Sequence, residues 1–320
     1  MTSQILRTDG LVLRNLRYGD TSRVATLLTA ELGKISVIGK GVREPTSPLG
    51  SSLELFARSE FVVYFRSGRN LQMLKSGDVI EPHSALAREP FRFVYGSAVV
   101  EFVDRMLLEE EPSPPLYSLV LRVLARIETV RRSRVNEVFR AFQLRAASIL
   151  GYALLLDGCL HCDRSLDEAV YAPLDPSGQG EIWLFRPSEG GALCAECARL
   201  VESGYPLTVR ALLRIRSMVR SEPGGAGPGA ALLERLPAAV RDESLERPRV
   251  GVGEESAERL EAGVGGESGE RYRASMDEGM DERRQEAEFR WGEALEQIVE
   301  SFLHFHVERY RGLRSLRTHG

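Results

Sequence analysis

The stretch that decides the fold of this chain is Cys159-Leu-His-Cys162, which is matched further on by Cys194-Ala-Glu-Cys197. These are the only four cysteines among the 320 residues, and 31 residues separate the two CxxC pairs. A CxxC pair on a tight turn aims two thiolates at one point, and four thiolates suit Zn²⁺ in tetrahedral geometry. We therefore predict one zinc ion per chain on Cys159, Cys162, Cys194 and Cys197. A site closed by four protein ligands leaves no position for water or substrate, so this zinc would be structural.

Two other uses of these cysteines are disulfide pairing and a thioredoxin-like redox motif. Disulfides form in oxidising compartments, and the first residues, Met-Thr-Ser-Gln followed by Ile-Leu-Arg, do not resemble a secretion signal. A redox CxxC motif normally stands alone at the start of a helix, which would leave the second pair without a role. His161 could replace one cysteine as a ligand, but a solvated or supporting position is favoured.

Hydrophobic residues alternate with a period of two from Ile5 to Glu81, and turns that contain glycine divide this segment into short strands. Five strands in about 80 residues match the size of a small closed barrel, for which the OB-fold is the natural candidate. Residues 1–82 are therefore expected to form an OB-fold domain that binds single strands through one sheet face and the loops after strands one and four. The expected strands cover residues 10–14, 23–29, 34–38, 61–65 and 71–74.

The formal net charge of −4 conceals a gradient along the chain. Residues 1–80 hold 11 Lys and Arg against 7 Asp and Glu, a surplus of +4, and contain all three lysines. Residues 81–220 hold 17 against 18, and residues 221–290 hold 10 against 17. A basic barrel suits a phosphate backbone, although each cation alone could be an ordinary solvated side chain. The candidate DNA contacts are Arg14, Arg17, Tyr18, Lys34, Lys40, Arg43, Arg66, Arg69 and Lys75.

After residue 82 the hydrophobic pattern changes to the period of helices. The regularly spaced aromatic residues of this part, such as Phe91, Tyr95 and Phe102, are most simply core residues. We expect an α+β multidomain protein in which the barrel precedes an all-α domain of residues 83–156 and 201–220, with the four-cysteine zinc finger inserted at 157–200. The expected helices cover residues 85–110, 116–130, 135–150, 195–200 and 208–219, and the expected hairpin pairs residues 170–172 with 181–186.

Residues 221–290 differ in composition from the rest of the chain. They combine glycine-rich stretches with Asp and Glu runs, and this low hydrophobicity with a charge of −7 is typical of disorder. The amphipathic pattern returns in residues 291–320, and a helix over 294–316 is expected to pack on the helical domain. Residues 221–290 would then be an insert rather than a tail. The apolar positions of the last helix are Leu295, Ile298, Phe302, Phe305 and Val307.

The sequence does not favour an enzyme. We find no clustered Asp, Glu and His set like that of a metal-dependent nuclease, since Asp9, Asp20 and Asp78 are scattered at turns, and no GxxxxGK[ST] motif for nucleotide phosphates occurs. No apolar run approaches the ~20 residues that a membrane span needs. The alternatives to a DNA-binding protein are a zinc-ribbon interaction scaffold that does not touch DNA and, from another class, a thiol oxidoreductase.

Several short motifs follow one another in an order that is specific when they are taken together. The front half holds Gly10-Leu-Val-Leu-Arg14, Gly19-Asp20, Gly33-Lys34, Gly39-Lys40-Gly41 and Leu53-Glu-Leu-Phe56, and the second half holds Phe139-Arg-Ala-Phe-Gln-Leu144, Leu150-Gly-Tyr152 and the two CxxC pairs. Over most of its length the chain resembles the bacterial recombination mediator family RecO.

This resemblance implies a non-enzymatic DNA repair protein of the bacterial cytoplasm, associated with the nucleoid. Family members bind single- and double-stranded DNA, anneal complementary strands, and work with RecR to load RecA onto strands covered by single-strand-binding protein. Some relatives lack the full cysteine set, which implies that the zinc supports structure rather than the shared activity. The acidic insert departs from the family pattern, and the basic character fades after Gly41 into Glu44-Pro45.

Overall fold

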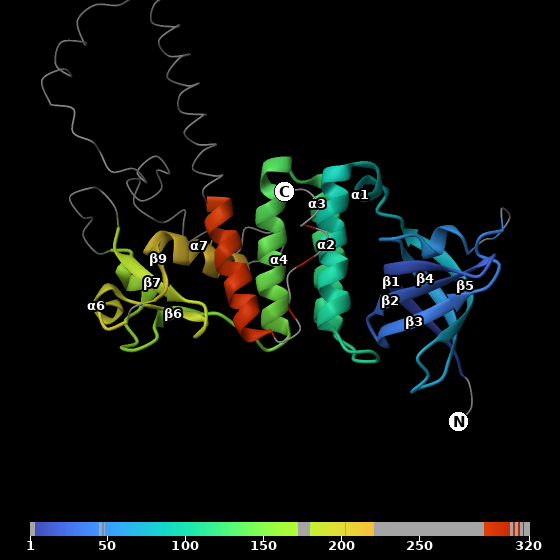
Figure 1. The fold of residues 1–320 in the computed structure, drawn as a ribbon, viewed down its shortest axis with the longest axis horizontal. Coiled ribbons are helices and arrows are strands. Elements are labelled where there is room, and N and C mark those ends of the chain that lie inside the picture. The colour runs from blue at the N-terminus through green and yellow to red at the C-terminus, as the bar shows by residue number, and fades with distance from the viewer. Residues whose placement is uncertain are drawn as a thin grey trace, which may run out of the picture. The chain divides into compact units, whose positions relative to one another are not determined.

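The computed structural model describes residues 4–44, 47, 49–171, 180–201, 203–220, 291–307, 310, 313 and 316. These residues form two compact units (Figure 1). The first unit contains residues up to 153 and those from 303 onwards, and the second contains residues 154–220 and 291–302. The acidic insert at 221–290 lies outside the described residues. None of the helices in the described part of the chain is both long and apolar enough to cross a membrane.

The first unit begins with the predicted five-stranded barrel, which is confirmed. The strands close in the order β1-β2-β3-β5-β4, and all neighbours are antiparallel except β3 and β5. Gly33 at the start of β3 has φ +68°, and a Cβ atom there would lie 2.5 Å from the backbone of Glu111, so only glycine fits. The strands are β1 (Gln4–Tyr18), β2 (Ser22–Thr29), β3 (Gly33–Gly39), β4 (Arg58–Phe65) and β5 (Gln72–Glu81).

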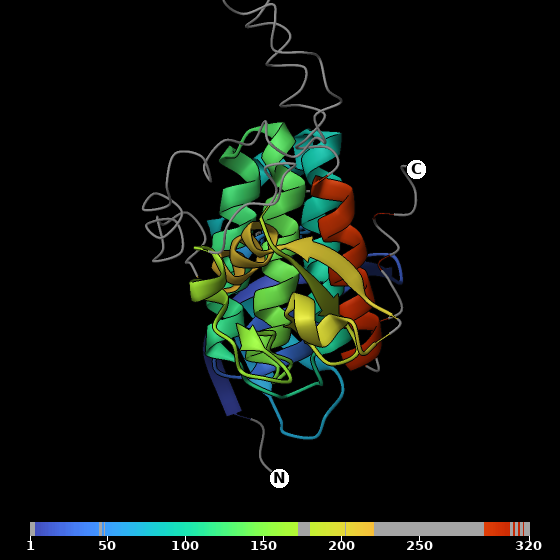
Figure 2. The ribbon, with the colours of Figure 1, turned by 90° about the vertical axis from the view of Figure 1, so that its left-hand side faces the viewer.

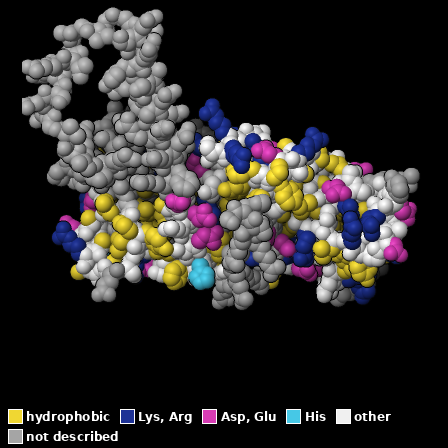
Figure 3. Space-filling view, turned by 45° about the horizontal axis from the view of Figure 1, so that its top comes forward, with side chains coloured by type: hydrophobic (Ala, Val, Ile, Leu, Met, Phe, Trp, Pro, Cys, Tyr) yellow, Lys and Arg dark blue, Asp and Glu magenta, His cyan; other side chains and the backbone are white. Residues whose placement is uncertain are grey.

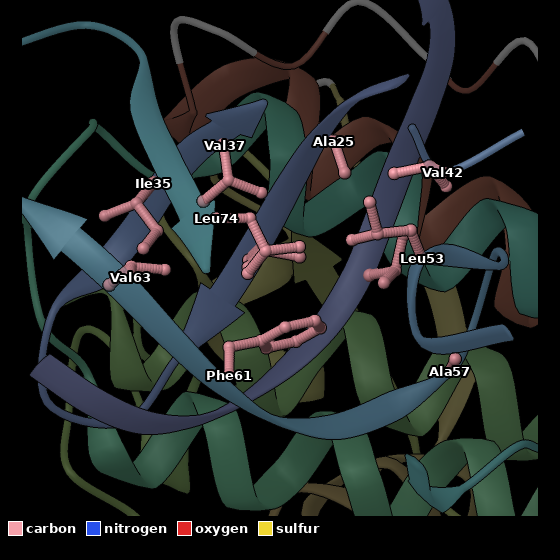
Figure 4. Packing of buried hydrophobic residues seen from close by; sticks show 11 residues of the cluster. Ala25, Ile35, Val37, Val42, Leu53, Ala57, Phe61, Val63 and Leu74 are labelled. Atoms are coloured by element: carbon pink, nitrogen blue, oxygen red, sulfur yellow. The ribbon is translucent and has the colours of Figure 1, made fainter. Parts of the chain in front are cut away.

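Alternate residues of the strands fill the barrel, as their period of two predicts (Figure 4). Phe61 of β4 lies at the centre with no exposed surface, and Phe65 packs against the same cluster while it stays partly exposed. The inward side chains of β1, β2, β3, β4 and β5 are Val12, Ala25, Leu27, Ile35, Val37, Phe61, Val63 and Leu74.

Helices follow the barrel within the same unit. The single helix expected over 85–110 is wrong, because Pro90 cannot donate a backbone hydrogen bond and its ring disfavours a helical Glu89. The chain therefore forms two helices there, and the second ends at Met106, well before Pro112. The helices expected over 116–130 and 135–150 are confirmed. The ring centroids of Phe102, on the second of the two new helices, and Phe142 lie 5.5 Å apart in the core. The helices are α1 (Ser84–Arg88), α2 (Pro90–Met106), α3 (Pro114–Thr129) and α4 (Val135–Ile149).

The second unit holds a small sheet with the strand order β6-β8-β7-β9. The expected hairpin of 170–172 with 181–186 is wrong, because β7 pairs with β8 and β9 while Val170 and Tyr171 follow the short helix α5. The sheet extends to residue 208, beyond the expected module of 157–200. The elements are β6 (Leu155–Cys159), α5 (Leu166–Ala169), β7 (Ile182–Arg186), β8 (Gly191–Leu193), α6 (Ala195–Ala198), β9 (Tyr205–Thr208) and α7 (Val209–Arg220).

The C-terminal helix covers residues 291–306 and is drawn in red in Figures 1 and 2. Its residues up to Phe302 belong to the second unit, where the ring of Trp291 lies under the Arg214 guanidinium and Ser301 Oγ lies 2.8 Å from Tyr205 Oη. Leu295, Ile298, Phe302 and Val307 are buried as expected. Phe305 is 64% exposed, so its assignment to the apolar face was wrong. Further on, Tyr310 is buried in the first unit against Phe102.

Candidate metal centre and nucleic-acid interface

The four cysteines converge at one point of the second unit. Cys159 ends β6, and Cys162 lies in the turn that follows. Cys194 immediately precedes α6, and Cys197 lies within it. All four Sγ atoms lie within 4.8 Å of one another, and Cys162 Sγ is 3.7 Å from Cys194 Sγ. Zn–S bonds of about 2.3 Å in a tetrahedron place sulfur atoms about 3.8 Å apart. The four thiols therefore have the chemistry and the spacing of a structural zinc centre.

Backbone N–H groups surround the innermost thiol. Burial raises the pKa of Cys159, but hydrogen bonds from the backbone N–H groups of Cys194, Cys162 and His161 outweigh burial and lower it to about 6. The bond from Cys194 N to Cys159 Sγ measures 3.3 Å. The thiol of Cys194 and the other neighbouring thiols raise the pKa of Cys197. Four thiolates at this spacing repel one another, and a divalent cation would remove that repulsion.

Two glycines permit close backbone contacts beside the CxxC turns. A Cβ atom at Gly191 would lie 2.8 Å from the Leu155 carbonyl oxygen, which belongs to the strand that carries Cys159. A Cβ atom at Gly158 would lie 2.9 Å from the Arg164 carbonyl oxygen beyond the first turn. Both positions therefore require close backbone contact, which glycine permits. His161 is exposed and is not one of the four clustered ligands.

The candidate DNA contacts of the barrel fall into two groups, and the larger one surrounds the turn between β1 and β2. Arg17 lies opposite Arg23 in the β1–β2 pairing, and Arg23 in turn lies opposite Gly39, the residue before Lys40. Arg43 donates to the carbonyl oxygen of Asp20 in this turn at 2.9 Å. Since β3 and β5 run parallel with Ile38 opposite Met73, Lys40 and Lys75 follow these partners at the same end of the barrel. We call this set the hairpin group: Arg14, Arg17, Tyr18, Lys40, Arg43 and Lys75, all of them exposed.

The second group lies at the opposite end of β3. Arg66 and Arg69 are exposed on the β4–β5 turn, where the amide of Gln72 donates to both of their carbonyl oxygens. This turn faces an acidic side chain, because the Gly68 N–H and the Ser67 hydroxyl donate to the Glu110 carboxylate. Lys34 is also occupied, since its Nζ lies 3.4 Å from an Asp104 carboxylate oxygen and its side chain is only 11% exposed.

The candidates therefore do not form one continuous surface. Lys34, whose carbonyl oxygen accepts from the N–H of Glu110 beside the β4–β5 turn, lies on β3 six positions before Lys40, a distance of about 20 Å at 3.3 Å per residue. Figure 3 shows one face of the molecule, with the Lys and Arg side chains of the described residues in dark blue. Lys34 leaves the candidate interface because it joins the barrel to α2. Tyr18, by contrast, is 60% exposed and lies within the more basic group.

One residue beside Tyr18 escaped the sequence interpretation. Leu16 is 55% exposed and points to the same side of β1 as Arg14 and Tyr18, since the three alternate along the strand after the bulge near Leu13. An apolar and an aromatic side chain next to a cation form a surface on which a base can stack. The alternation of residues 14, 16 and 18 in the sequence could have indicated a shared face. The bulge near Leu13, which decides that this face is the exposed one, is visible only in the structure.

Comparisons with known proteins agree with this architecture. The chain matches the family models "Recombination protein O N terminal" over residues 1–83 and "Recombination protein O C terminal" over residues 87–227. The chain belongs to the recombination protein O family. This confirms the resemblance inferred from the motifs, and the first model covers the barrel while the second covers the helices and the cysteine module.

Three relatives, each named DNA repair protein RecO, illustrate the similarity. The protein of Salinibacter ruber is 37% identical over 153 residues, which are 48% of this chain and 58% of that protein. The protein of Heliobacterium modesticaldum is 32% identical over 75% of this chain and 84% of its own length. The protein of Acetivibrio thermocellus is 27% identical over 68% of this chain and 80% of its own length. The match spans less than two thirds of the Salinibacter relative. The recombination protein O family is thus one of DNA repair proteins.

Proposed function

We propose that this family member binds single- and double-stranded DNA through the hairpin group of the barrel and anneals complementary strands. The observation that carries the proposal is the convergence of exposed Arg17, Lys40 and Arg43 around one turn that also presents Tyr18. Cations of this kind neutralise phosphates and release counterions, and the ring and Leu16 offer stacking without reading sequence. Binding should therefore tolerate any sequence and weaken steeply with salt.

We further propose that the four cysteines hold a structural zinc ion and that the chain acts as a mediator rather than as an enzyme. As in the resemblance described above, its partners would be RecR, single-strand-binding protein and, indirectly, RecA. The closed thiolate set supports a folding role for the metal, since a site with four protein ligands offers no open position for chemistry.

Strand annealing by the purified chain tests the proposal. We expect the full-length protein to accelerate annealing of two complementary oligonucleotides in low salt and to lose this effect in high salt. A zinc chelator should reduce annealing only to the extent that it unfolds the second unit, which circular dichroism on the same samples measures. A chain that folds, holds its metal and neither binds nor anneals strands would favour the alternative of an interaction scaffold that does not touch DNA.

A further inference from the structure

A buried histidine in the first unit lies between two carboxylates. His83 follows β5 directly, its side chain has no exposed surface, and its neighbours are Glu81 at the end of β5 and Glu128 on α3. His83 Nδ1 lies 2.9 Å from Glu128 Oε2, and His83 Nε2 lies 3.8 Å from Glu81 Oε2. One imidazole thus faces an acidic group on each side, at the point where the barrel meets the helices.

The hydrogen bond on one side fixes the chemistry of the other side. An ionised carboxylate only accepts hydrogen bonds, so the contact with Glu128 places a proton on Nδ1. In the neutral ring, Nε2 then carries a lone pair. Among the described residues this buried Nε2 atom has no hydrogen-bond partner, and the Glu81 carboxylate that it faces at 3.8 Å is also an acceptor. Two acceptors that face each other across 3.8 Å repel one another unless a cation or a hydrogen-bond donor lies between them.

No arginine or lysine among the described residues pairs with the Glu81 or the Glu128 carboxylate. Arg58 lies opposite Glu81 in the β4–β5 pairing, but its guanidinium binds Asp9 instead, with Nη2 at 2.5 Å from Oδ2. Two carboxylates therefore meet one imidazole without a compensating positive charge.

We propose that this position is a second metal site, at which a divalent ion of the Zn²⁺ or Mn²⁺ class binds His83 Nε2 and the Glu81 carboxylate. Glu128 would hold the ring in the required tautomer, as a carboxylate commonly does behind a metal-bound histidine. Nitrogen with carboxylate oxygen suits these ions, whose bonds of about 2.0–2.2 Å need only a small rotation of Glu81. The Glu81 side chain is 43% exposed, so it can rotate and leaves room for water ligands and for entry of the ion.

The site is separate from the cysteine centre and would fasten the end of β5 beside α3. Glu81 and His83 stand on the link that leaves the barrel, while Glu128 stands on the helix that faces it. Metal bound to the folded state and not to the unfolded chain would raise the thermal midpoint of the first unit.

Binding of Mn²⁺ to the zinc-loaded full-length chain tests the proposal, because Mn²⁺ prefers oxygen and nitrogen to thiolates. At pH 8 we expect one bound Mn²⁺ per chain by electron paramagnetic resonance and a higher thermal midpoint. Glu81→Gln should abolish both effects, and Glu128→Gln should weaken binding about 10–100-fold. His83→Asn, which tolerates the left-handed backbone at φ +44°, should also abolish binding.

Asp78→Asn is the matched control, since it removes an exposed carboxylate from the same strand outside the site. It should bind Mn²⁺ like the parent. The proposal is overturned if the parent binds no Mn²⁺, or if folded Glu81→Gln binds Mn²⁺ as tightly as the parent and Asp78→Asn do. The first of these results would leave a proton as the cation between His83 and Glu81.

Discussion

The phenol of Tyr117, on α3, donates a hydrogen bond of 2.8 Å to Oδ1 of Asp9, on β1 of the barrel. The same carboxylate accepts two hydrogen bonds from Arg58 on β4, with Nε at 3.0 Å and Nη2 at 2.5 Å from Oδ2. Burial, followed by the hydrogen bond to the Asp9 carboxylate, raises the pKa of Tyr117. One aspartate therefore joins two strands of the barrel to the helix that packs against them.

Removing the Tyr117 hydroxyl should weaken this junction. Because the hydroxyl bonds to a charged acceptor, we expect Tyr117→Phe to lower the free energy of unfolding by about 1.5–3 kcal/mol in urea titrations. Tyr64→Phe, which removes a partly exposed hydroxyl from β4, is the control and should be nearly neutral. Equal stability of the two variants would show that the bond to Asp9 contributes nothing.

The pH dependence of the same variant gives a second readout. The folded-state pKa of Tyr117 lies above its unfolded value of about 10. The stability that this shift contributes is therefore fully present below pH ~10 and is lost as the pH rises further. The stability difference between parent and Tyr117→Phe should shrink above pH ~10.

Loss of one metal ligand should destabilise the second unit. Cys159→Ser replaces a buried thiol that accepts several backbone hydrogen bonds, and the free energy of zinc binding is folding free energy. We expect a parent with one zinc per chain by elemental analysis, a variant without it, and a lower thermal midpoint for the variant. The DNA affinity of the folded variant should stay close to that of the parent, because the hairpin group lies in the other unit. A metal-free parent purified under reducing conditions would contradict this prediction.

The close approach at Gly191 can be tested without touching a ligand. Gly191→Ala places a Cβ atom 2.8 Å from the Leu155 carbonyl oxygen, and overpacking of this kind costs about 1–3 kcal/mol. We expect weaker zinc retention against a competing chelator. Gly180→Ala is the control, because its Cβ atom would meet no atom within 4 Å. Equal zinc retention in both variants would mean that the two CxxC turns tolerate separation.

The period of two was enough to predict the barrel, the helical period predicted most helices, and the cysteine spacing predicted that the four cysteines converge. The break at Pro90 was missed because the apolar pattern continues on both sides of Glu89 and Pro90. A proline is tolerated in the first turn of a helix but not in its interior, so Pro90 should have marked a new helix. The partners of β7 could not be predicted, since the pairing of short strands depends on tertiary contacts. The ion pair between Lys34 and Asp104 likewise could not be predicted, because the two residues are 70 positions apart and no local sequence pattern links them.

Deletion of residues 224–285, which lie outside the described part of the chain, should leave folding nearly unchanged. Each doubling of loop length costs only about 0.6 kcal/mol, and the composition of this segment does not favour a core. We expect the same urea midpoint within error for the deletion variant and the parent. A cooperative loss of structure would contradict this. Tighter DNA binding after deletion would indicate that the acidic residues of this segment compete with DNA for the barrel.

The affinity of charge-reversed variants for single-stranded DNA, measured by fluorescence anisotropy across a salt series, tests the central claim most directly. Arg17→Glu with Lys40→Glu changes the hairpin group, and Arg66→Glu with Arg69→Glu changes the other end of the barrel. We predict that the first pair weakens binding and flattens the log–log salt slope by about 1.4, since each lost phosphate contact contributes about 0.7. The variant with Arg66→Glu and Arg69→Glu should have an affinity closer to that of the parent. If the first pair binds as tightly as the parent with an unchanged slope, the hairpin group is not the DNA site, and the exposed arginines at 131, 132 and 134 become the candidates.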